Sequence, residues 1–237
     1  MRVLVTRPEP GAARTAARLR ALGLDAILLP LSETRPLSVD PDAAAPDTAA
    51  VAVTSANALR HAPPALIARL AALPCHAVGK RTAEAARAAG FRTVTEGPGD
   101  AAGLARSIAA GLAGRKLAYL CGRVRFPGFE DRLSKAGVTV CPIETYDTLA
   151  VVYSDEKVRT RLSGGPVDAV LLYSVKAAEV ARDLIARPAL AGLFENARIL
   201  ALSQRIGAAF GPAAVTPSRP DENDLLALLR KSTQKSE

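Results

Sequence analysis

The chain has 237 residues, 49% of them hydrophobic, and its 31 Lys and Arg residues outnumber its 23 Asp and Glu residues to give a formal net charge of +8. No apolar run approaches the ~18–20 residues of a membrane span, so the composition argues against a membrane partner. The charge favours an anionic ligand, but nucleic acid is the weaker choice because aromatic residues make up 4% of the chain and Trp is absent.

Short apolar stretches alternate along the chain with segments of helical periodicity. Strands are predicted at residues 2–6, 25–30, 50–54, 75–79, 92–95, 116–121, 138–143, 168–173, 197–202 and 213–216. Helices are predicted at residues 10–22, 56–70, 81–89, 101–112, 127–136, 175–186, 204–210 and 221–231. This alternation predicts an α/β protein whose parallel sheets carry helices on both faces. Pro63 and Pro64 are expected to break the helix after residue 61.

The chain also resembles itself, because three segments recur in the same order. Residues 18–34, 51–61 and 77–86 are echoed by residues 132–148, 169–179 and 201–210. A chain of this length suits two compact cores of ~100–120 residues. The repeat therefore predicts two similar α/β lobes, and a functional site is sought between them.

Two segments lack helical character and are expected to cross between the lobes. Residues 32–41 carry two prolines, and residues 144–152 are extended and rich in β-favouring residues. If both segments are extended, they can pair as a short two-stranded connection.

The cysteines and histidines argue against disulfides and metal. Cys75, Cys121 and Cys141 lie far apart and form no CxxC pair, which favours a reducing, cytoplasmic location. His61 and His76 have no ligand-type cluster beside them in the sequence, so no metal site is expected.

Hydroxyl, amide and cationic side chains follow the predicted strands at their carboxyl ends, where open α/β sheets bind ligands. The residues at these positions are Arg7, Thr54, Ser55, Asn57, Lys80, Thr82, Arg123, Ser174, Ser203 and Arg205. Helix N-termini and such donors bind carboxylates or phosphates, so their recurrence indicates a distributed anion site. The alternative is that the hydroxyl residues serve only as helix caps.

Common catalytic signatures are missing from the sequence. It contains no GxxxxGK[ST] phosphate loop, no GxGxxG at the first helix and no GxSxG nucleophile turn. The sequence has two histidines, so it offers few side chains for general acid–base catalysis. An enzyme built on this chain is therefore expected to work mainly by holding a reactive substrate in one geometry.

An ordered series of short motifs resembles the uroporphyrinogen-III synthase family, the cofactor-free cyclases of tetrapyrrole biosynthesis. The motifs are TRP at 6–8, VAVTSANAL at 51–59, AVGKRTAEAARAAGF at 77–91, EGPGDAAGLA at 96–105, ETYDT at 144–148, LLYSVKAA at 171–178 and ALSQRIGAA at 201–209. The resemblance covers essentially the whole chain, and the TS-x-N turn and the Y-x-T triplet are its best markers. Val175 departs from the family pattern, in which proline or asparagine is commoner.

The resemblance implies two α/β lobes joined by a two-stranded β ladder. The first lobe would contain residues 1–35 and 149–237 and the second residues 38–146, with hinge crossings at 35–38 and 146–149. The implied substrate is hydroxymethylbilane, a linear tetrapyrrole with eight carboxylates, which is closed to uroporphyrinogen III with inversion of the last ring and loss of water. The resemblance implies no cofactor. A cytoplasmic monomer in transient contact with the preceding pathway enzyme is expected.

The resemblance also assigns roles to residues. Tyr146 is the candidate proton donor to the leaving hydroxyl, although a phenol with its ordinary pKa of ~10 is a weak acid at neutral pH and a packing role is the alternative. The implied substrate-binding residues are Thr54, Ser55, Asn57, Lys80, Thr82, Ser174 and Ser203, with Arg7, Arg123 and Arg205 added by position. A non-catalytic two-lobe binding or sensor protein for a small polyanion is the alternative function, and it would not need Tyr146.

Overall fold

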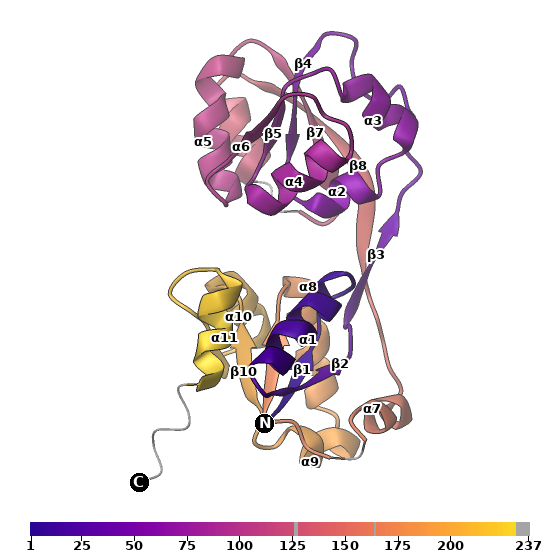
Figure 1. Ribbon diagram of the computed structural model, residues 1–237, viewed down its shortest axis with the longest axis vertical. Helices are drawn as coiled ribbons and strands as arrows, with labels where there is room; N and C mark the ends of the chain where they lie inside the picture. The colour runs from indigo at the N-terminus through magenta and orange to yellow at the C-terminus, as the bar shows by residue number, and fades with distance from the viewer. Residues whose placement is uncertain (126–127, 164, 231–237) are drawn as a thin grey trace. The chain divides into compact units, whose positions relative to one another are not determined.

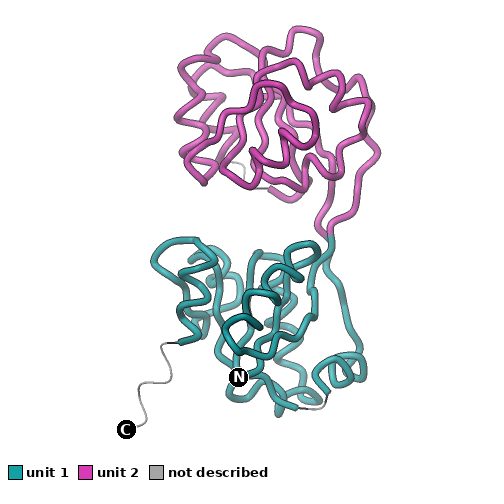
Figure 2. Tube along the Cα trace, in the orientation of Figure 1, with its two compact units in different colours: residues 1–33, 149–237 teal, residues 34–148 magenta. Residues whose placement is uncertain are grey.

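The computed structural model of the protein describes residues 1–125, 128–163 and 165–230. Its internal contacts divide the chain into two compact units: unit 1 contains Met1–Glu33 and Leu149–Glu237, and unit 2 contains Thr34–Thr148 (Figure 2). Residues 127 and 231, at the ends of two helices expected from the sequence, lie outside the described residues, as do residues 231–237 of the expected first lobe.

Unit 1 is built on a five-stranded sheet in the order β11-β10-β9-β1-β2, in which each neighbouring pair runs parallel (Figure 1). The strands are β1 (Arg2–Val5), β2 (Asp25–Leu28), β9 (Ala169–Leu172), β10 (Arg198–Ala201) and β11 (Ala214–Val215). The helical elements are α1 (Gly11–Ala21), α7 (Asp155–Arg161), α8 (Val175–Ile185), the 3-10 turn η1 (Pro188–Leu190), α9 (Ala191–Phe194), α10 (Gln204–Phe210) and α11 (Glu222–Arg230).

Both faces of the unit 1 sheet are buried under helices. Val3 and Val5 pack in a cluster with Leu19 of α1 and Leu225 of α11, whereas Leu4, between them in the sequence, belongs to a second cluster with α8. This division follows from the two-residue period of a strand, which sends neighbouring side chains to opposite faces. A strand buried on both faces reads as a continuous apolar run, as the sequence of β1 does.

Unit 2 carries a six-stranded sheet in the order β3-β8-β7-β4-β5-β6. Its strands are β3 (Ser32–Pro36), β4 (Thr48–Val53), β5 (Cys75–Ala77), β6 (Val94–Glu96), β7 (Lys116–Gly122) and β8 (Thr139–Ala150). Its helices are α2 (Ala56–Arg60), α3 (Pro64–Leu70), α4 (Lys80–Ala88), α5 (Ala101–Leu112) and α6 (Gly128–Lys135). Residues of α2, α3 and α4 pack in one core cluster and residues of α5 and α6 in another (Figure 1).

Strands β3 and β8 contain the two points at which the chain passes from one unit to the other. They are neighbours in the sheet. The Leu37 N–H donates to the Thr145 carbonyl at 3.0 Å, and the Val151 N–H donates to the Leu31 carbonyl at 3.1 Å, so the two strands run antiparallel. Both segments that the sequence marked as crossings are thus extended and paired along part of their length.

The structure corrects several expected elements. The helix expected at 56–70 is two helices, because Pro63 and Pro64 stand between α2 and α3 and Pro64 occupies the first turn of α3, where a missing N–H is tolerated. Strand β8 extends to Ala150, well beyond the expected 138–143. Helices α7 and α9 were not expected, although Ser154 caps α7 by accepting the Lys157 N–H.

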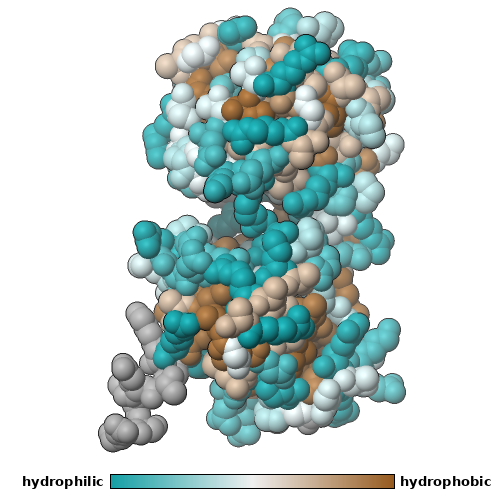
Figure 3. Space-filling model, viewed as in Figure 1, coloured by the Kyte–Doolittle hydropathy of each residue, from teal (hydrophilic) through white to brown (hydrophobic). Residues whose placement is uncertain are grey.

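The surface carries its large hydrophobic residues singly. In the described part of the chain, the exposed ones are Met1, Leu22, Val124, Val152 and Val215, which are scattered through the sequence. Hydrophilic and hydrophobic residues are mixed over the face seen in Figure 3. None of the described helices has the length and apolar character needed to cross a membrane. Within residues 1–125, 128–163 and 165–230, no group of three His, Cys, Asp or Glu side chains is placed to hold a metal ion.

Candidate active site

The carboxyl ends of neighbouring strands in unit 2 bring several expected site residues to one edge of the sheet. Thr54 and Ser55 follow β4, Lys80 follows β5, and Arg123 follows β7. Tyr146 lies within β8 and is paired with Gly122, the last residue of β7. Because the strand order is β8-β7-β4-β5, these residues follow one another along the edge at which open α/β sheets bind ligands.

Tyr146 is held in a nearly closed setting. Its side chain is 9% exposed, and its ring centroid lies 5.7 Å from that of His61. Burial raises the pKa of the phenol above its ordinary value of 10.0, while a hydrogen bond with the Ser55 side chain opposes the shift. The phenol is therefore protonated at neutral pH.

His61 is less suited to acid–base work than its position suggests. Its Nε2 lies 2.9 Å from the Thr34 hydroxyl oxygen. Burial, followed by the nearby Arg60 charge, lowers the pKa of the imidazole below its ordinary value of 6.5. The ring is consequently neutral at pH 7 and serves as a packing partner for Tyr146.

The turn after β4 is tied down by its own hydrogen bonds. The Thr54 hydroxyl lies 2.7 Å from the hydroxyl of Tyr119, whose pKa burial raises to about 12. Ser55 caps α2 by accepting the Asn57 N–H at 3.2 Å, and the Asn57 side-chain oxygen accepts from Arg60 at 2.7 Å. The capping alternative therefore describes what Ser55 does in this structure, in addition to its contact with Tyr146.

Lys80 and Thr82 differ in their availability to a ligand. Lys80 is exposed and begins α4, whose N-terminus has no side-chain cap. Thr82 is 6% exposed and shares the buried face of α4 with Ala83 and Ala86. The expectation that both residues offer polar groups to a ligand is therefore better supported for Lys80.

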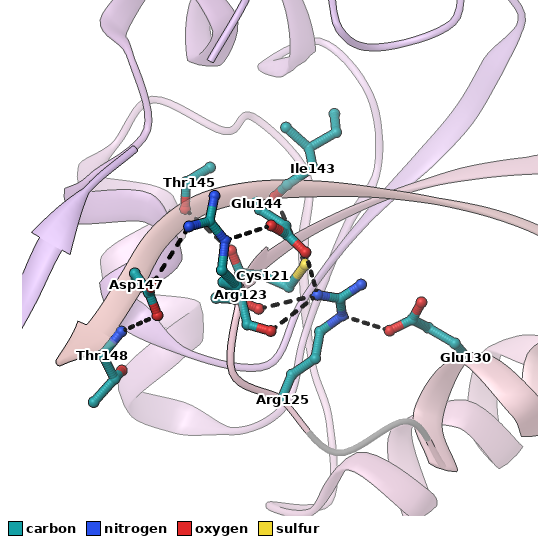
Figure 4. Close-up of polar contacts among 10 residues, drawn as sticks. Cys121, Arg123, Arg125, Glu130, Ile143, Glu144, Thr145, Asp147 and Thr148 are labelled. Atoms are coloured by element: carbon teal, nitrogen blue, oxygen red, sulfur yellow. Dashed lines mark hydrogen bonds and ion pairs between the residues drawn. The ribbon is translucent and has the colours of Figure 1, made fainter. Parts of the chain in front are cut away.

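The loop after β7 contains a network of charges that the sequence reading identified only in part (Figure 4). Arg123 donates to Glu144 at 3.3 Å and to Asp147 at 3.5 Å. Arg125 donates to the other oxygen of Glu144 at 2.7 Å and to Glu130 at 2.6 Å. The hydrogen bond from Arg125 is the main cause that lowers the pKa of Glu144 below its ordinary 4.5, against the opposing effect of burial.

Arg123, an expected ligand for substrate carboxylates, thus already has two protein carboxylates as partners. Its side chain is 56% exposed, so these pairs are weak and can be exchanged for another anion. Arg125 and Glu144 were missed because their roles depend on contacts between residues 19–21 apart, in β8 and in the loop after β7, which no local motif reveals.

In unit 1 the expected residues also follow the strands. Arg7 comes two residues after β1, Ser174 follows β9, and Ser203 and Arg205 follow β10. Ser174 caps α8 by accepting the Ala177 N–H at 3.1 Å, and Ser203 caps α10 by accepting from Ile206 at 3.5 Å. As in unit 2, hydroxyls that the sequence analysis expected to bind a ligand cap helices in this structure.

Arg7 is held by the last described helix. Its guanidinium donates to Glu222 at 3.2 Å and lies 4.2 Å above the centre of the Tyr173 ring. The same carboxylate accepts from the hydroxyl groups of Thr15 at 2.5 Å and Tyr173 at 3.0 Å, and from Arg18 at 2.8 Å. Burial opposes ionisation of Glu222, but these donors lower its pKa below 4.5 overall. The sequence offered no signal for Glu222, since its partners Arg7, Thr15 and Arg18 lie 204–215 residues away.

Comparison with models of protein families identifies the family of this chain. A family model described as uroporphyrinogen-III synthase HemD matches residues 13–227. The chain belongs to the uroporphyrinogen-III synthase family. Members of this family are cyclising lyases that act on hydroxymethylbilane in tetrapyrrole biosynthesis. The resemblance and the function derived from it are confirmed, and a non-catalytic binding or sensor protein is not favoured.

Solved structures of uroporphyrinogen-III synthases share the fold. The enzyme from Helicobacter pylori 26695 is 15% identical, with 98% of this chain and 99% of that chain covered and a TM-score of 0.64. A mutant enzyme from the extreme thermophile Thermus thermophilus is 21% identical, with 99% of each chain covered and a TM-score of 0.58. The predicted α/β class, with parallel sheets flanked by helices, is thereby confirmed. A comparison with curated protein sequences gives no significant match.

Proposed function

We propose that this chain closes hydroxymethylbilane to uroporphyrinogen III, with inversion of the last pyrrole ring, and that the phenol of Tyr146 protonates the leaving hydroxyl. The observation that carries the proposal is the setting of Tyr146. Its phenol is buried and protonated at neutral pH, and it stands at the carboxyl edge of the unit 2 sheet, where the Ser55 side chain partly offsets the rise in its pKa. A donor for a leaving hydroxyl needs to keep its proton until the carbon–oxygen bond breaks.

The proposed reaction balances with this one donor. The carbon–oxygen bond of the terminal hydroxymethyl group breaks as the pyrrole nitrogen supplies an electron pair, and the phenol proton leaves with the hydroxyl as water. The resulting azafulvene carbon bonds to the substituted α-carbon of the last ring, and the spiro intermediate fragments and recloses with that ring reversed. The proton lost from the free α-carbon on reclosure returns to the phenolate of Tyr146. The net change is the loss of one water.

A raised phenol pKa is compatible with this role. The acceptor is a departing hydroxide, whose conjugate acid, water, has a pKa of ~15.7. Any phenol pKa between the ordinary value of 10.0 and that of water makes the transfer favourable once the bond breaks. Burial therefore raises the pKa of Tyr146 without preventing the phenol from acting as the proton donor.

The remaining proposed contacts hold the substrate carboxylates. Within unit 2 we assign this role to the residues Thr54, Ser55, Asn57, Lys80, Thr82 and Arg123, and within unit 1 to Arg7, Ser174, Ser203 and Arg205. Lys80 and Arg123 supply exposed positive charge, and the hydroxyls of Thr54, Ser55, Ser174 and Ser203 lie where helices α2, α8 and α10 begin. The positive N-terminal ends of helices favour carboxylates. Holding the bilane in one shape is what favours attack at the substituted carbon over spontaneous closure at the unsubstituted one.

The organisation of the protein is proposed with the same function. We assign the lobes to residues 1–35 with 149–237 and to 38–146, with hinge crossings at 35–38 and 146–149, and we expect a cytoplasmic monomer in transient contact with the preceding pathway enzyme. Light scattering after size exclusion should give the mass of one chain, and a dimer mass would contradict this part of the proposal.

The test is a coupled assay in which hydroxymethylbilane is generated in situ and the oxidised porphyrin isomers are resolved. We expect the wild-type protein to shift the product from the type I to the type III isomer. Tyr146→Phe should lower kcat by at least tenfold, with the residual product moving toward type I. Tyr153→Phe is the matched control, because it removes a phenol that donates to the Pro30 carbonyl at 3.0 Å within unit 1. Type I product alone from folded wild-type protein would reject the function, and full activity of Tyr146→Phe would reject the role of the phenol.

A further inference from the structure

We propose that Thr145 is a positioning residue for the reaction: it forms a β-bulge that turns Tyr146 toward Ser55, and its hydroxyl holds both partners in place. The inference rests on the role proposed for Tyr146 and goes beyond it, since Thr145 itself touches no substrate.

The register between β7 and β8 shifts by one residue at this point. Cys121 pairs with Glu144, but the next residue of β7, Gly122, pairs with Tyr146. Thr145 is therefore an extra residue in β8 that has no pairing partner in β7. An insertion of this kind is a β-bulge, which locally bends a strand and re-aims the side chains that follow it.

Core packing shows what the bulge accomplishes. In a regular strand, residues three apart point to opposite faces of the sheet. Ile143 and Tyr146 are three apart, yet both pack in the same cluster, with Ala58 of α2 and Leu120 of β7. If β8 continued in regular register, with Thr145 paired to Gly122, Tyr146 would point to the opposite face, on which Tyr119 and Cys121 pack with α5 and α6. The bulge thus places the phenol on the face that carries Ser55 and His61.

The side chain of Thr145 fixes the bulge by hydrogen bonds to two elements. Thr145 is 0% exposed, and its hydroxyl oxygen lies 2.8 Å from the Ala58 carbonyl and 3.4 Å from the Cys121 carbonyl. Its own carbonyl accepts the Leu37 N–H at 3.0 Å. Ala58 lies in the last turn of α2, where carbonyls have no partner within the helix, so the Thr145 hydroxyl supplies one.

These contacts connect the strand that carries Tyr146 with helix α2, which Ser55 caps. Helix α2 begins directly after Ser55 and is only one and a half turns long, so an anchor at Ala58 also limits movement of Ser55. Loss of the hydroxyl should release α2 and the bulge together. The phenol would then lose its fixed position, although every group proposed to contact the substrate would still be present.

Thr48 offers a matched control for the loss of a buried hydroxyl. It is 8% exposed, its hydroxyl donates to the Ala45 carbonyl at 2.6 Å, and it too stands beside a register shift, between Thr48 and Ala50 of β4. Thr48 begins β4 and therefore lies at the amino edge of the sheet, away from Tyr146. Thr48→Val and Thr145→Val remove the same group in similar surroundings.

The experiment compares Thr145→Val, Thr145→Ser and Thr48→Val in the isomer assay, with melting temperature and the Cζ resonances of labelled tyrosine recorded for each. The chain has four tyrosines, so the Tyr146 resonance is assigned from Tyr146→Phe. Thr145→Val should lower kcat by at least tenfold with KM changed less than threefold, and should shift the Tyr146 resonance. Thr145→Ser should restore kcat to within threefold of wild type, and Thr48→Val should leave both kcat and the resonance unchanged.

Two further comparisons separate this inference from the proposed role of Tyr146. In a Tyr146→Phe background, Thr145→Val should lower kcat no further, because both changes act through the same phenol. If Tyr146→Phe alone leaves kcat unchanged, the role of the phenol fails, and the Tyr146 resonance still decides whether Thr145 positions it. An unshifted resonance in Thr145→Val, or an equal loss of kcat in Thr48→Val, would overturn the inference. Thr145→Ala, judged by the same criteria, replaces Thr145→Val if that variant does not fold.

Discussion

Tyr146 lies directly over Gly122, its pairing partner across β7 and β8. A Cβ atom on Gly122 would stand 2.6 Å from Cζ of the Tyr146 ring and 3.0 Å from both Cε atoms. No residue with a side chain fits there unless the phenol moves. Gly122 therefore belongs to the arrangement that sets the height of the phenol above the sheet.

We expect Gly122→Ala to displace the Tyr146 ring and to lower kcat by at least tenfold. Overpacking of this kind also costs about 1–3 kcal/mol of unfolding free energy. Gly111→Ala is the control, because a Cβ at this position in α5 meets nothing within 4 Å and should stabilise the helix by about 0.5–1 kcal/mol. Isomer-resolved kinetics measure kcat, and urea unfolding measures the unfolding free energy. Wild-type kcat in Gly122→Ala would show that the reaction does not depend on the position of the phenol above the sheet.

Glu222 should contribute to stability in a pH-dependent way. Its pKa is lowered in the folded protein, so its contribution is fully present above the ordinary pKa of 4.5 and is lost as pH falls through the folded value. We expect Glu222→Gln to lower the unfolding free energy by about 1–3 kcal/mol at pH 7, because Arg7 and Arg18 lose a charged acceptor. The difference from wild type should shrink below pH 4.5 in urea titrations.

Asp224→Asn is the matched control for Glu222→Gln. It removes a carboxylate from the same helix, but its partner Arg219 is 79% exposed. Exposed ion pairs contribute little to stability, so we expect a smaller effect at pH 7. If the two variants lose equal unfolding free energy, the contacts of Glu222 with α1 and with the loop after β1 add no stability beyond that of a carboxylate on α11.

Local sequence signals predicted those elements whose ends are set locally. Helix α5 was expected at 101–112 and is found there, since Asp100 caps it by accepting the Gly103 N–H at 2.7 Å. The prolines at 63 and 64 likewise gave the break between α2 and α3. The cap formed by Ser154 is an equally local signal, but it was overlooked and α7 was not predicted.

Features that depend on distant partners could not be read from the sequence. The bulge at Thr145 exists only relative to β7, because one strand alone has no register. Arg7 was chosen for its place after β1, yet its partner Glu222 lies 215 residues away. For the expected site, sequence position predicted which residues stand at the strand ends. It did not predict which of them already have protein partners.

Cys75 should make the protein sensitive to alkali. Burial raises the pKa of its thiol from 9.0 to about 12, so stability is fully present below pH 9.0 and is lost as pH rises toward 12. One such group steepens the fall by up to about 1.4 kcal/mol per pH unit. We expect Cys75→Ala to be less stable than wild type at pH 7 because a buried sulfur is lost, but to lose less stability between pH 9 and pH 10.5. Parallel slopes in the two proteins would show that the thiol does not ionise on unfolding.

The two possible roles of Ser174 can be separated by a substitution that preserves one and opposes the other. Aspartate is as good an N-cap as serine, so Ser174→Asp should keep the cap on α8 and leave the melting temperature within a few degrees. Its charge would repel a substrate carboxylate, and we expect KM for hydroxymethylbilane to rise at least fivefold. Ser154→Asp is the control, since Ser154 caps α7 in the same way and is not among the residues proposed to bind the substrate. If Ser174→Asp leaves KM unchanged, the hydroxyl of Ser174 is a helix cap and takes no part in holding the substrate.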